Sequence, residues 1–348
     1  MNFNSFEEKF RDKASKAGYS EENIQKCLNY AKPLIKTNLP VIFNTSNLSA
    51  LVGYKKNYIK KAALFTDSFY RRFVIKKRNG KPRYLKEPLP SLKEIQCWIL
   101  ENILYEIPVS RFAKAYIPKR NLLDNVKYHK DKKIVMCLDI EDFFSSIKRS
   151  SIEEIFRKKG YSSNIANLLS KLCCCNDFLP QGAPTSPYLS NIFMTEFDSI
   201  LSMYCQRQNL RYTRYADDIT VSGEINQPEI IKEFMKSELE KLRLTLNDNK
   251  SKVMGKNVRQ IVTGIVVNQF IQVPKSMRDK IRQELFFIKK VGLQQHLKNT
   301  NNQRSNYVNH LIGKINYVLY INSKDKKMQE HYTFMQSFLN PTDSKKDD

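Results

Sequence analysis

The sequence predicts an α+β fold in which helices at both ends of the chain flank a central region of strands. Two segments indicate strands. The apolar run "KKIVMCLDI" is typical of a strand buried on both faces, and "RYADDITVS" has the pattern of a tight hairpin. Towards the C-terminus, apolar residues recur at helical spacing and predict an amphipathic helix: Met277, Ile281, Leu285 and Ile288.

The charge of the chain points to a polyanionic partner. Its 348 residues include 59 Lys and Arg against 35 Asp and Glu, a formal net charge of +24. Such an excess is the electrostatic signature of a protein that binds nucleic acid. No apolar run is long enough to span a bilayer, and the N-terminus "MNFNSFEEKF" lacks the pattern of a signal peptide. We therefore expect a cytoplasmic protein without a membrane partner.

Seven cysteines include three in a row, Cys173, Cys174 and Cys175. A metal or redox site is one interpretation. However, there is no CxxC pair, and the four histidines do not fall at ligand spacing. Buried, reduced thiols that pack as small hydrophobic side chains are the favoured interpretation.

The N-terminal quarter of the chain predicts helices followed by a hairpin. Residues 1–65 are basic and helical in pattern, with Ser20 before Glu21 and Glu22 as a helix start. "FYRRFVIKKRNGKPRYLKEP" then predicts two strands around Asn79-Gly80, the pair that most readily forms a type I′ turn. The many basic residues of this hairpin suit either a solvated edge strand or a flap over phosphates, and composition does not separate the two.

Further helices follow the hairpin. Ser91 with Glu94, and Ser151 with Glu154, have the spacing of capping boxes. Ser186-Pro187 opens a longer helix, whose apolar face is predicted to run through Leu189, Ile192, Phe193, Phe197, Ile200, Leu201 and Tyr204.

The acidic residues at the ends of the predicted strands suggest chemistry. If the two segments are neighbours in one sheet, Asp139 meets Asp217 and Asp218. Three such carboxylates repel one another, which raises their pKa values, and divalent cations such as Mg²⁺ relieve that repulsion. Two cations about 4 Å apart assist in-line phosphoryl transfer. The alternative for "ADD" alone is a polar turn with solvated acids.

Together the segments resemble a reverse transcriptase. "YADDITVS" is similar to the family's YxDD hairpin, and "LDIEDFFSSI" to the strand that carries its first catalytic aspartate. "LPQGAPTSP", "FVIKKRNGKPRYLKEP" and "LNDNKSKVM" resemble its PQG segment, fingers hairpin and lysine-bearing motif. The five occur in the family's order and cover about residues 69 to 265.

The resemblance implies a site for two Mg²⁺ ions and a dNTP. Asp139, Asp217 and, more weakly, Asp218 would be the catalytic residues, and the metal-binding set is Asp139, Ile140, Asp217 and Asp218. The nucleotide-binding set is Arg83, Phe144, Gln181, Gly182 and Lys250. In that set Phe144 would be the steric gate against the sugar 2′-OH. Lys250 would assist the departing pyrophosphate, although a solvated surface lysine is an equal alternative.

Two further segments resemble signatures of bacterial retron reverse transcriptases. "NVKYH" is similar to their NAxxH motif, with Val126 in place of the usual alanine, and "IVTGIVV" carries their VTG motif. An ordinary turn with glycine at positive φ is the alternative for the latter. The resemblance implies RNA binding by Asn125, His129, Val262, Thr263 and Gly264.

The expected architecture is a right-hand polymerase with fingers, palm and helical thumb. The predicted regions are a helical N-terminal extension (1–65), fingers and palm (66–255), a thumb or RNA-recognition region (256–335) and a disordered tail (336–348).

The expected function is reverse transcription of a cognate noncoding RNA into multicopy single-stranded DNA (msDNA) in an antiphage system with a separate effector protein. Synthesis would be primed by a 2′-OH of that RNA. One alternative is a diversity-generating or group II-derived reverse transcriptase. Another is an inactive polymerase fold that serves as an RNA-binding scaffold.

Overall fold

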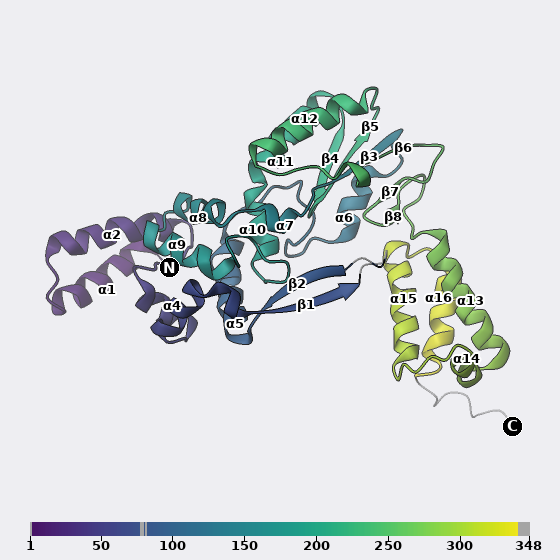
Figure 1. Cartoon of the computed structure of the whole chain (residues 1–348), viewed down its shortest axis with the longest axis horizontal. Helices are drawn as coiled ribbons and strands as arrows, with labels where there is room; N and C mark the ends of the chain where they lie inside the picture. The colour runs from purple at the N-terminus through teal and green to yellow at the C-terminus, as the bar shows by residue number, and fades with distance from the viewer. Residues whose placement is uncertain (1, 77–79, 81, 340–348) are drawn as a thin grey trace.

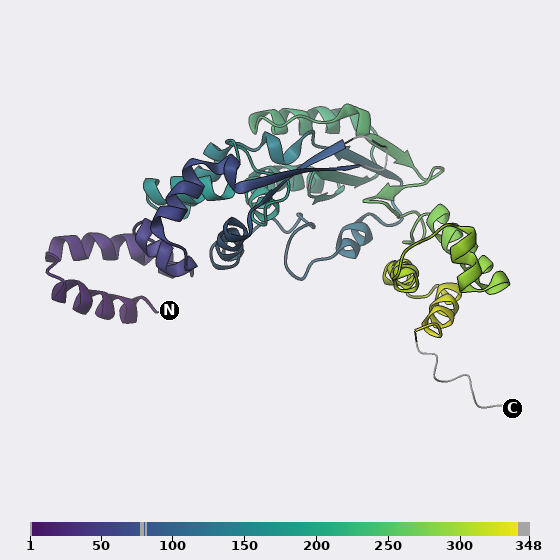
Figure 2. The same ribbon diagram turned by 60° about the horizontal axis from the view of Figure 1, so that its bottom comes forward.

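The structure is a computed structural model that describes residues 2–76, 80 and 82–339. The chain is elongated, with its N-terminal helices at one end, its C-terminal helices at the other and a four-stranded sheet between them (Figure 1). A turned view shows the molecule as an arch, with both termini towards its lower ends (Figure 2). The α+β prediction is therefore confirmed.

The N-terminal region is helical. Ser20 caps its second helix as predicted, since its hydroxyl accepts a hydrogen bond from the backbone N–H of Asn23 at 3.4 Å. Leu34, Ile42 and Ile59 are fully buried in the main core, which joins this region to the rest of the chain. The helices are α1 (Phe3–Lys16), α2 (Glu21–Lys36), α3 (Thr45–Val52) and α4 (Lys56–Leu64), followed by the 3₁₀ helix η1 (Thr66–Phe69).

The predicted hairpin is present. Strands β1 (Tyr70–Lys76) and β2 (Pro82–Pro88) pair antiparallel, from Tyr70 opposite Pro88 to Lys76 opposite Pro82. Gly80 has φ +80°, in the left-handed region that glycine favours. The predicted turn also involves Asn79, which lies outside the described residues together with Lys77, Arg78 and Lys81.

The central sheet has the strand order β4-β5-β3-β6, and all neighbours are antiparallel (Figure 1). The buried strand predicted from "KKIVMCLDI" is β3, and "RYADDITVS" supplies the turn between β4 and β5. The bounds are β3 (Ile134–Asp139), β4 (Arg211–Tyr215), β5 (Asp218–Gly223) and β6 (Lys252–Gly255). Register places Asp139 directly opposite Asp218, so the first and second acidic segments meet at one end of the sheet.

Helices surround the sheet and the hairpin. They are α5 (Pro90–Asn102), α6 (Leu122–Val126), α7 (Phe143–Ser146), α8 (Arg149–Lys158), α9 (Ser163–Cys173), α10 (Ser186–Phe193), α11 (Thr195–Arg207) and α12 (Pro228–Lys241). Helix α5 contacts β2, α6 and α11 contact β4, and others, such as α8 and α9, pack on one another. Short 3₁₀ helices are η2 (Leu104–Glu106), η3 (Lys127–His129) and η4 (Asp248–Lys250).

Three local predictions about these helices are wrong. Ser91 and Ser151 are not caps, because α5 starts at Pro90 and α8 at Arg149. Ser91 and Glu94 instead make tertiary hydrogen bonds with Tyr58 and Tyr54. The helix that opens at Ser186 is split into α10 and α11 at Met194, where the backbone leaves helical geometry with ψ near 2°.

The C-terminal region has a small hairpin and a helical unit with its own core. Strands β7 (Ile261–Val262) and β8 (Ile265–Val266) precede α13 (Lys275–Val291), α14 (Leu293–Asn299), α15 (Tyr307–Ile321) and α16 (Lys326–Gln336). Ile281, Leu285 and Ile288 of the predicted stripe are buried there. This core also includes Val135 of β3, so the helical unit is joined to the sheet. Residues 337–339 form a turn, and residues 340–348 of the predicted disordered tail lie outside the described residues.

The three consecutive cysteines pack as predicted. Cys173, Cys174 and Cys175 are buried and free, and burial raises the pKa of Cys173 to about 12, as expected for packed thiols. Within the described ranges, no helix has the length and apolar character needed to cross a bilayer.

Candidate active site

Three carboxylates meet where the central sheet ends. Asp139 is the last residue of β3, Asp218 is the first of β5, and Asp217 lies in the two-residue turn before it. The Ile140 N–H donates to the backbone carbonyl of Asp217 at 3.1 Å, which ties the turn to the end of β3. Asp139 is buried, while Asp217 and Asp218 are half-buried. The fold therefore brings the three acids together, as the sequence predicts.

The acids repel one another in their ionised forms. Burial and the charges of Asp217 and Asp139 raise the pKa of Asp218 from 3.8 to about 7. Burial, followed by Asp139, also raises the pKa of Asp217, although Lys250 and Arg83 act in the opposite direction. A strong shift caused by desolvation and like charges is typical of a functional site.

We expect Mg²⁺ to stabilise the folded chain more at about pH 8 than at about pH 5. Because folding raises the pKa of Asp218 from 3.8 to about 7, the folded chain keeps a proton that the unfolded chain loses in this range. The free energy of unfolding should therefore fall as the pH rises through this window, and a cation can restore it only once the carboxylates are ionised. Thermal unfolding with and without Mg²⁺ at both pH values measures this. An equal gain in Tm at the two pH values would contradict it.

Lys250 forms an ion pair with one of the acids. It ends η4, and its Nζ lies 2.7 Å from Oδ2 of Asp139. Burial alone would lower the pKa of Lys250, but the contact with Asp139 and the fields of Asp217 and Asp218 outweigh it and raise that pKa. The side chain is 58% exposed, so it can move without breaking the core.

The predicted metal ligands fit a divalent cation by their chemistry. They are oxygen donors, which Mg²⁺ prefers, and their mutual repulsion is relieved by positive charge. No group of three or more His, Cys, Asp or Glu side chains in the described part of the chain is already arranged around a metal position. In the structure the ammonium group of Lys250 instead neutralises Asp139.

The segment predicted to hold the nucleotide packs against β2. The Lys86 N–H donates to the Gln181 carbonyl at 3.0 Å, three residues from Arg83 on the same strand. Gly182 has φ +133°, and a Cβ built there would lie 2.7 Å from the Lys86 carbonyl oxygen, so this contact requires glycine. Arg83 is exposed and its charge acts on Asp217, which places it near the acids.

Phe144 lies in α7, five residues beyond Asp139. It is half-buried, whereas its neighbour Phe143 is buried in the core, as the sequence favours. The ring centroid of Phe144 is 6.4 Å from that of Tyr116. Tyr116 was not predicted. It has φ +62°, and partial burial followed by the charge of Asp217 raises its pKa.

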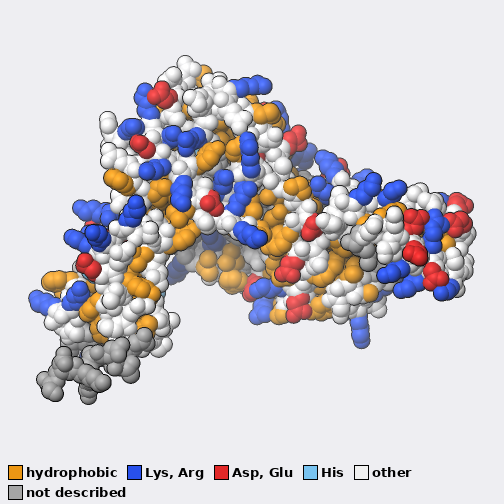
Figure 3. All heavy atoms as spheres, turned by 180° about the vertical axis from the view of Figure 1, so that it is seen from behind, with side chains coloured by type: hydrophobic (Ala, Val, Ile, Leu, Met, Phe, Trp, Pro, Cys, Tyr) orange, Lys and Arg blue, Asp and Glu red, His pale blue; other side chains and the backbone are white. Residues whose placement is uncertain are grey.

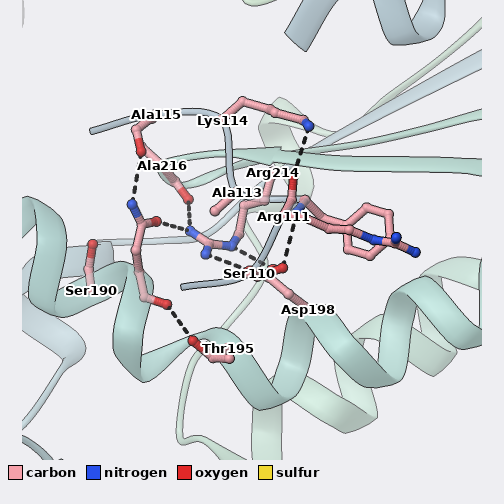
Figure 4. A network of polar contacts seen from close by, with 12 residues as sticks. Ser110, Arg111, Ala113, Lys114, Ala115, Ser190, Thr195, Asp198, Arg214 and Ala216 are labelled. Carbon is pink, nitrogen blue, oxygen red and sulfur yellow. Dashed lines mark hydrogen bonds and ion pairs between the residues drawn. The ribbon is translucent and has the colours of Figure 1, made fainter. Parts of the chain in front are cut away.

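A buried arginine, which the sequence did not predict as part of the site, supports the turn that carries Asp217. The side chain of Arg214 on β4 is fully buried and faces Asp198 on α11 (Figure 4). Its Nε and Nη2 each lie 2.8 Å from a carboxylate oxygen of Asp198, a bidentate pair. Nη1 donates to the Ala216 carbonyl at 3.0 Å and to Asn191 Oδ1 at 3.1 Å. Ala216 itself has φ +59°, which is uncommon for alanine, so this network holds a strained turn.

The predicted RNA-binding residues divide into two groups. Gly264 is exposed and Thr263 is half-buried in the β7–β8 turn, with Val262 buried beside them. Asn125 and His129 are fully buried, and their polar atoms contact protein groups. Because these two side chains are buried, RNA cannot contact them directly in this structure. This corrects the direct RNA-binding role that the resemblance implies for Asn125 and His129.

One cavity joins the acids to the β7–β8 turn. It measures about 580 Å³ and is lined by Asp139 and Asp218 as well as by Thr263 and Gly264. Lys250, Lys252 and Arg259 also line it. Cations beside carboxylates in one open cavity suit a ligand that carries phosphates.

Comparison with known proteins agrees with this arrangement. The family described as reverse transcriptase (RNA-dependent DNA polymerase) matches residues 75–267, more than half of the chain. The retron Ec86 reverse transcriptase of Escherichia coli is 28% identical over 294 residues, 83% of this chain and 88% of that protein. The retron Ec73 reverse transcriptase of the same species is 30% identical over 258 residues, 68% of this chain and 81% of that protein.

Among solved structures, telomerase from Candida albicans in complex with a fragment of telomeric RNA aligns with a TM-score of 0.44 and 10% identity, over 78% of this chain and 57% of that chain. That likeness is too low to carry an argument. The family match and the two bacterial relatives are sufficient. The chain belongs to the reverse transcriptase family, has its right-hand polymerase fold, and is an RNA-directed DNA polymerase of the retron type.

Proposed function

We propose that the chain copies a cognate structured noncoding RNA into msDNA, and that a 2′-OH of this RNA is the primer. The observation that carries the proposal is the cavity of about 580 Å³ that both Asp139 and Thr263 line. An RNA strand held at the β7–β8 turn can reach the acids within one cavity. A separate primer is then unnecessary.

The acids form the reaction centre of this proposal. Asp139, Ile140, Asp217 and Asp218 are the proposed ligands of two Mg²⁺ ions. When bound, these ions stabilise charge on the attacking and departing oxygens. Asp139 and Asp218 are held opposite each other by strand register, and Asp217 by the turn, so the chain fixes their positions before substrate binds.

The remaining predicted residues would hold the dNTP. Arg83 on the exposed hairpin can donate to the triphosphate in a charge-assisted fork. Gln181 and Gly182, fixed against β2, would lie beside the sugar. Lys250 can swing from Asp139 towards the departing pyrophosphate once the acids are neutralised, because its side chain is more than half exposed.

The alternatives differ in what the chain does with RNA. An inactive scaffold has no need of Asp139, Asp217 and Asp218 as a set, and the chain is an RNA-directed DNA polymerase by family. A diversity-generating or group II-derived enzyme would not account for the similarity to retron reverse transcriptases. From the same resemblance we also propose that the chain acts in an antiphage system with a separate effector protein.

Phe144→Ala is expected to admit ribonucleotides more readily. The half-buried ring lies beside Tyr116, and truncation opens space where a sugar 2′-OH would fit. The ratio of rNTP to dNTP incorporation on primed poly(rA) and related templates measures this. Phe143→Leu, a change within the core beside it, is the control. An unchanged ratio in a folded Phe144→Ala variant would assign the ring to packing.

RNA choice tests the proposal most directly. The nucleic acid that co-purifies with the chain should be one structured RNA joined to DNA through a 2′ linkage. Replacing residues 256–335 by those of a related enzyme should transfer RNA choice and leave extension of a supplied primer–template intact. Lys and Arg side chains are spread widely over the face in Figure 3. Their charge alone would therefore give affinity for any RNA and would not select one RNA over another. A chimera that keeps its original RNA would place recognition elsewhere.

A further inference from the structure

A buried polar chain links the β7–β8 turn to the catalytic sheet. His129 Nδ1 lies 2.7 Å from Ser222 Oγ on β5, and Nε2 lies 2.7 Å from Thr213 Oγ1 on β4. Thr213 donates to Asn125 Oδ1 at 2.6 Å, and Asn125 Nδ2 donates to Thr263 Oγ1 at 3.4 Å. Four of the five side chains are fully buried, and Thr263 is half-buried.

The hydrogen bonds of this buried polar series all point the same way, with each donor on the Ser222 side and each acceptor on the Thr263 side. Thr213 donates its only hydroxyl proton to Asn125, so its hydroxyl oxygen must accept a hydrogen bond from His129 Nε2–H. The other ring nitrogen, Nδ1, then accepts from the Ser222 hydroxyl. The imidazole has to be neutral for this pattern, and burial with the charges of Arg211 and Lys114 lowers the pKa of His129 to about 3. Every donor in the series therefore has one acceptor, an arrangement in which hydrogen bonds strengthen one another.

Thr263, the last residue of this buried polar series, has a strained backbone. Thr263 has φ +45° and Gly264 has φ +84°, and both lie between the paired residues Val262 and Ile265. Positive φ at both central positions is the geometry of a type I′ turn. Glycine adopts it freely, but a β-branched threonine there is an outlier that persists only when its surroundings hold it. Asn125 is the side chain that contacts the Thr263 hydroxyl.

The polar chain and the acids share one face of the sheet. Asp218, Thr220 and Ser222 alternate along β5 and so project to the same side. Thr213 pairs with Thr220, and Asp139 pairs with Asp218. Asp218, Thr220 and Thr263 all line the cavity of about 580 Å³. The strand that begins at a catalytic acid is thus the strand to which the turn is anchored.

We infer that Asn125 and His129 are positioning residues that fix the Thr263 turn relative to the acids, so that the priming RNA strand enters with its hydroxyl aligned. The inference rests on the proposed function, since it concerns initiation on the RNA partner. It assigns these two side chains no contact with RNA. Extension of a DNA end that is already paired to a template depends less on the turn than initiation does.

Asn125→Ala is expected to lower initiation about tenfold more than it lowers extension, because a misplaced attacking group costs rate steeply. Initiation is measured on an in vitro transcript of the RNA that co-purifies with the wild-type chain, and extension on oligo(dT)-primed poly(rA). Gln96→Ala is the matched control. Gln96 is also a fully buried amide, with hydrogen bonds of 2.8 Å to Tyr70 and to the Leu172 carbonyl, and it should move both activities together.

A double-mutant cycle tests the route through Thr263. Glycine at position 263 removes the strain that Asn125 offsets, so Asn125→Ala should cost initiation less than about twofold in a Thr263→Gly background. The same tenfold loss in both backgrounds would overturn the inference. So would equal losses of initiation and extension in Asn125→Ala, measured at a temperature where the variant is folded. A wild-type chain that cannot initiate on its RNA would instead overturn the proposed function, and the inference with it.

Discussion

Asp217→Asn is expected to reduce dNTP incorporation by roughly 10³-fold or more, because the phosphoryl transfer loses a carboxylate at its charged centre. The substitution keeps the shape of the side chain. Since burial and Asp139 raise the pKa of Asp217, ionisation of this group is unfavourable in the fold. A neutral amide should therefore leave the free energy of unfolding unchanged or raise it.

Glu224→Gln is the matched control for this variant. Glu224 follows the far end of β5 and is exposed, with a long contact of 3.9 Å to Lys133. It also loses one negative charge, but away from the acids, so incorporation should stay at the wild-type level. Extension of primed poly(rA), together with urea unfolding, measures both effects. Normal extension by a folded Asp217→Asn variant would contradict the proposed mechanism.

The acids were predictable because local sequence determines their placement. A two-residue turn between strand-forming segments puts Asp217 and Asp218 at the tip of a hairpin, whatever the rest of the fold does. The apolar run before Asp139 similarly predicts a buried strand. Only the register of β3 against β5 had to come from the structure.

The supporting residues were not predictable in this way, because their partners lie on other elements. Arg214 sits in a strand whose sequence offers no sign that Asp198, on a preceding helix, is its partner. One signal was present: an arginine between strand-forming residues, three positions before a pair of acids, needs a partner if its side chain is buried. Asn125 and His129 show a related limit. Motif resemblance identified them, but motif letters do not say which way a side chain faces.

Local helix signals failed where tertiary contacts compete with them. Ser91 has the spacing of a cap, yet Pro90 starts the helix and the Ser91 hydroxyl contacts Tyr58. Cap preference contributes about 1 kcal/mol, which one buried tertiary hydrogen bond can match. The break at Met194 has no counterpart in the apolar pattern, which continues across it.

Arg214→Met is expected to lower the free energy of unfolding by about 3–5 kcal/mol, because it leaves the Asp198 carboxylate buried without its cation. Both side chains are fully buried, and the pair is bidentate. Tyr212 still donates to Asp198 at 2.5 Å, but one neutral donor does not replace a guanidinium. Urea unfolding followed by circular dichroism measures the loss. A loss below about 1 kcal/mol would contradict a dry, charged pair at this position.

The double variant Arg214→Met/Asp198→Leu separates stability from catalysis. Removing both charges leaves no unpaired buried ion, so most of the lost free energy of unfolding should return. Extension activity should not return with it, because Ala216, at φ +59°, has still lost the Nη1 donor that lies 3.0 Å from its carbonyl oxygen. That carbonyl precedes Asp217, and a turn that relaxes displaces the carboxylate from Asp139. A double variant that recovered both stability and extension would show that Arg214 acts only as packing, and that the turn holds its own geometry.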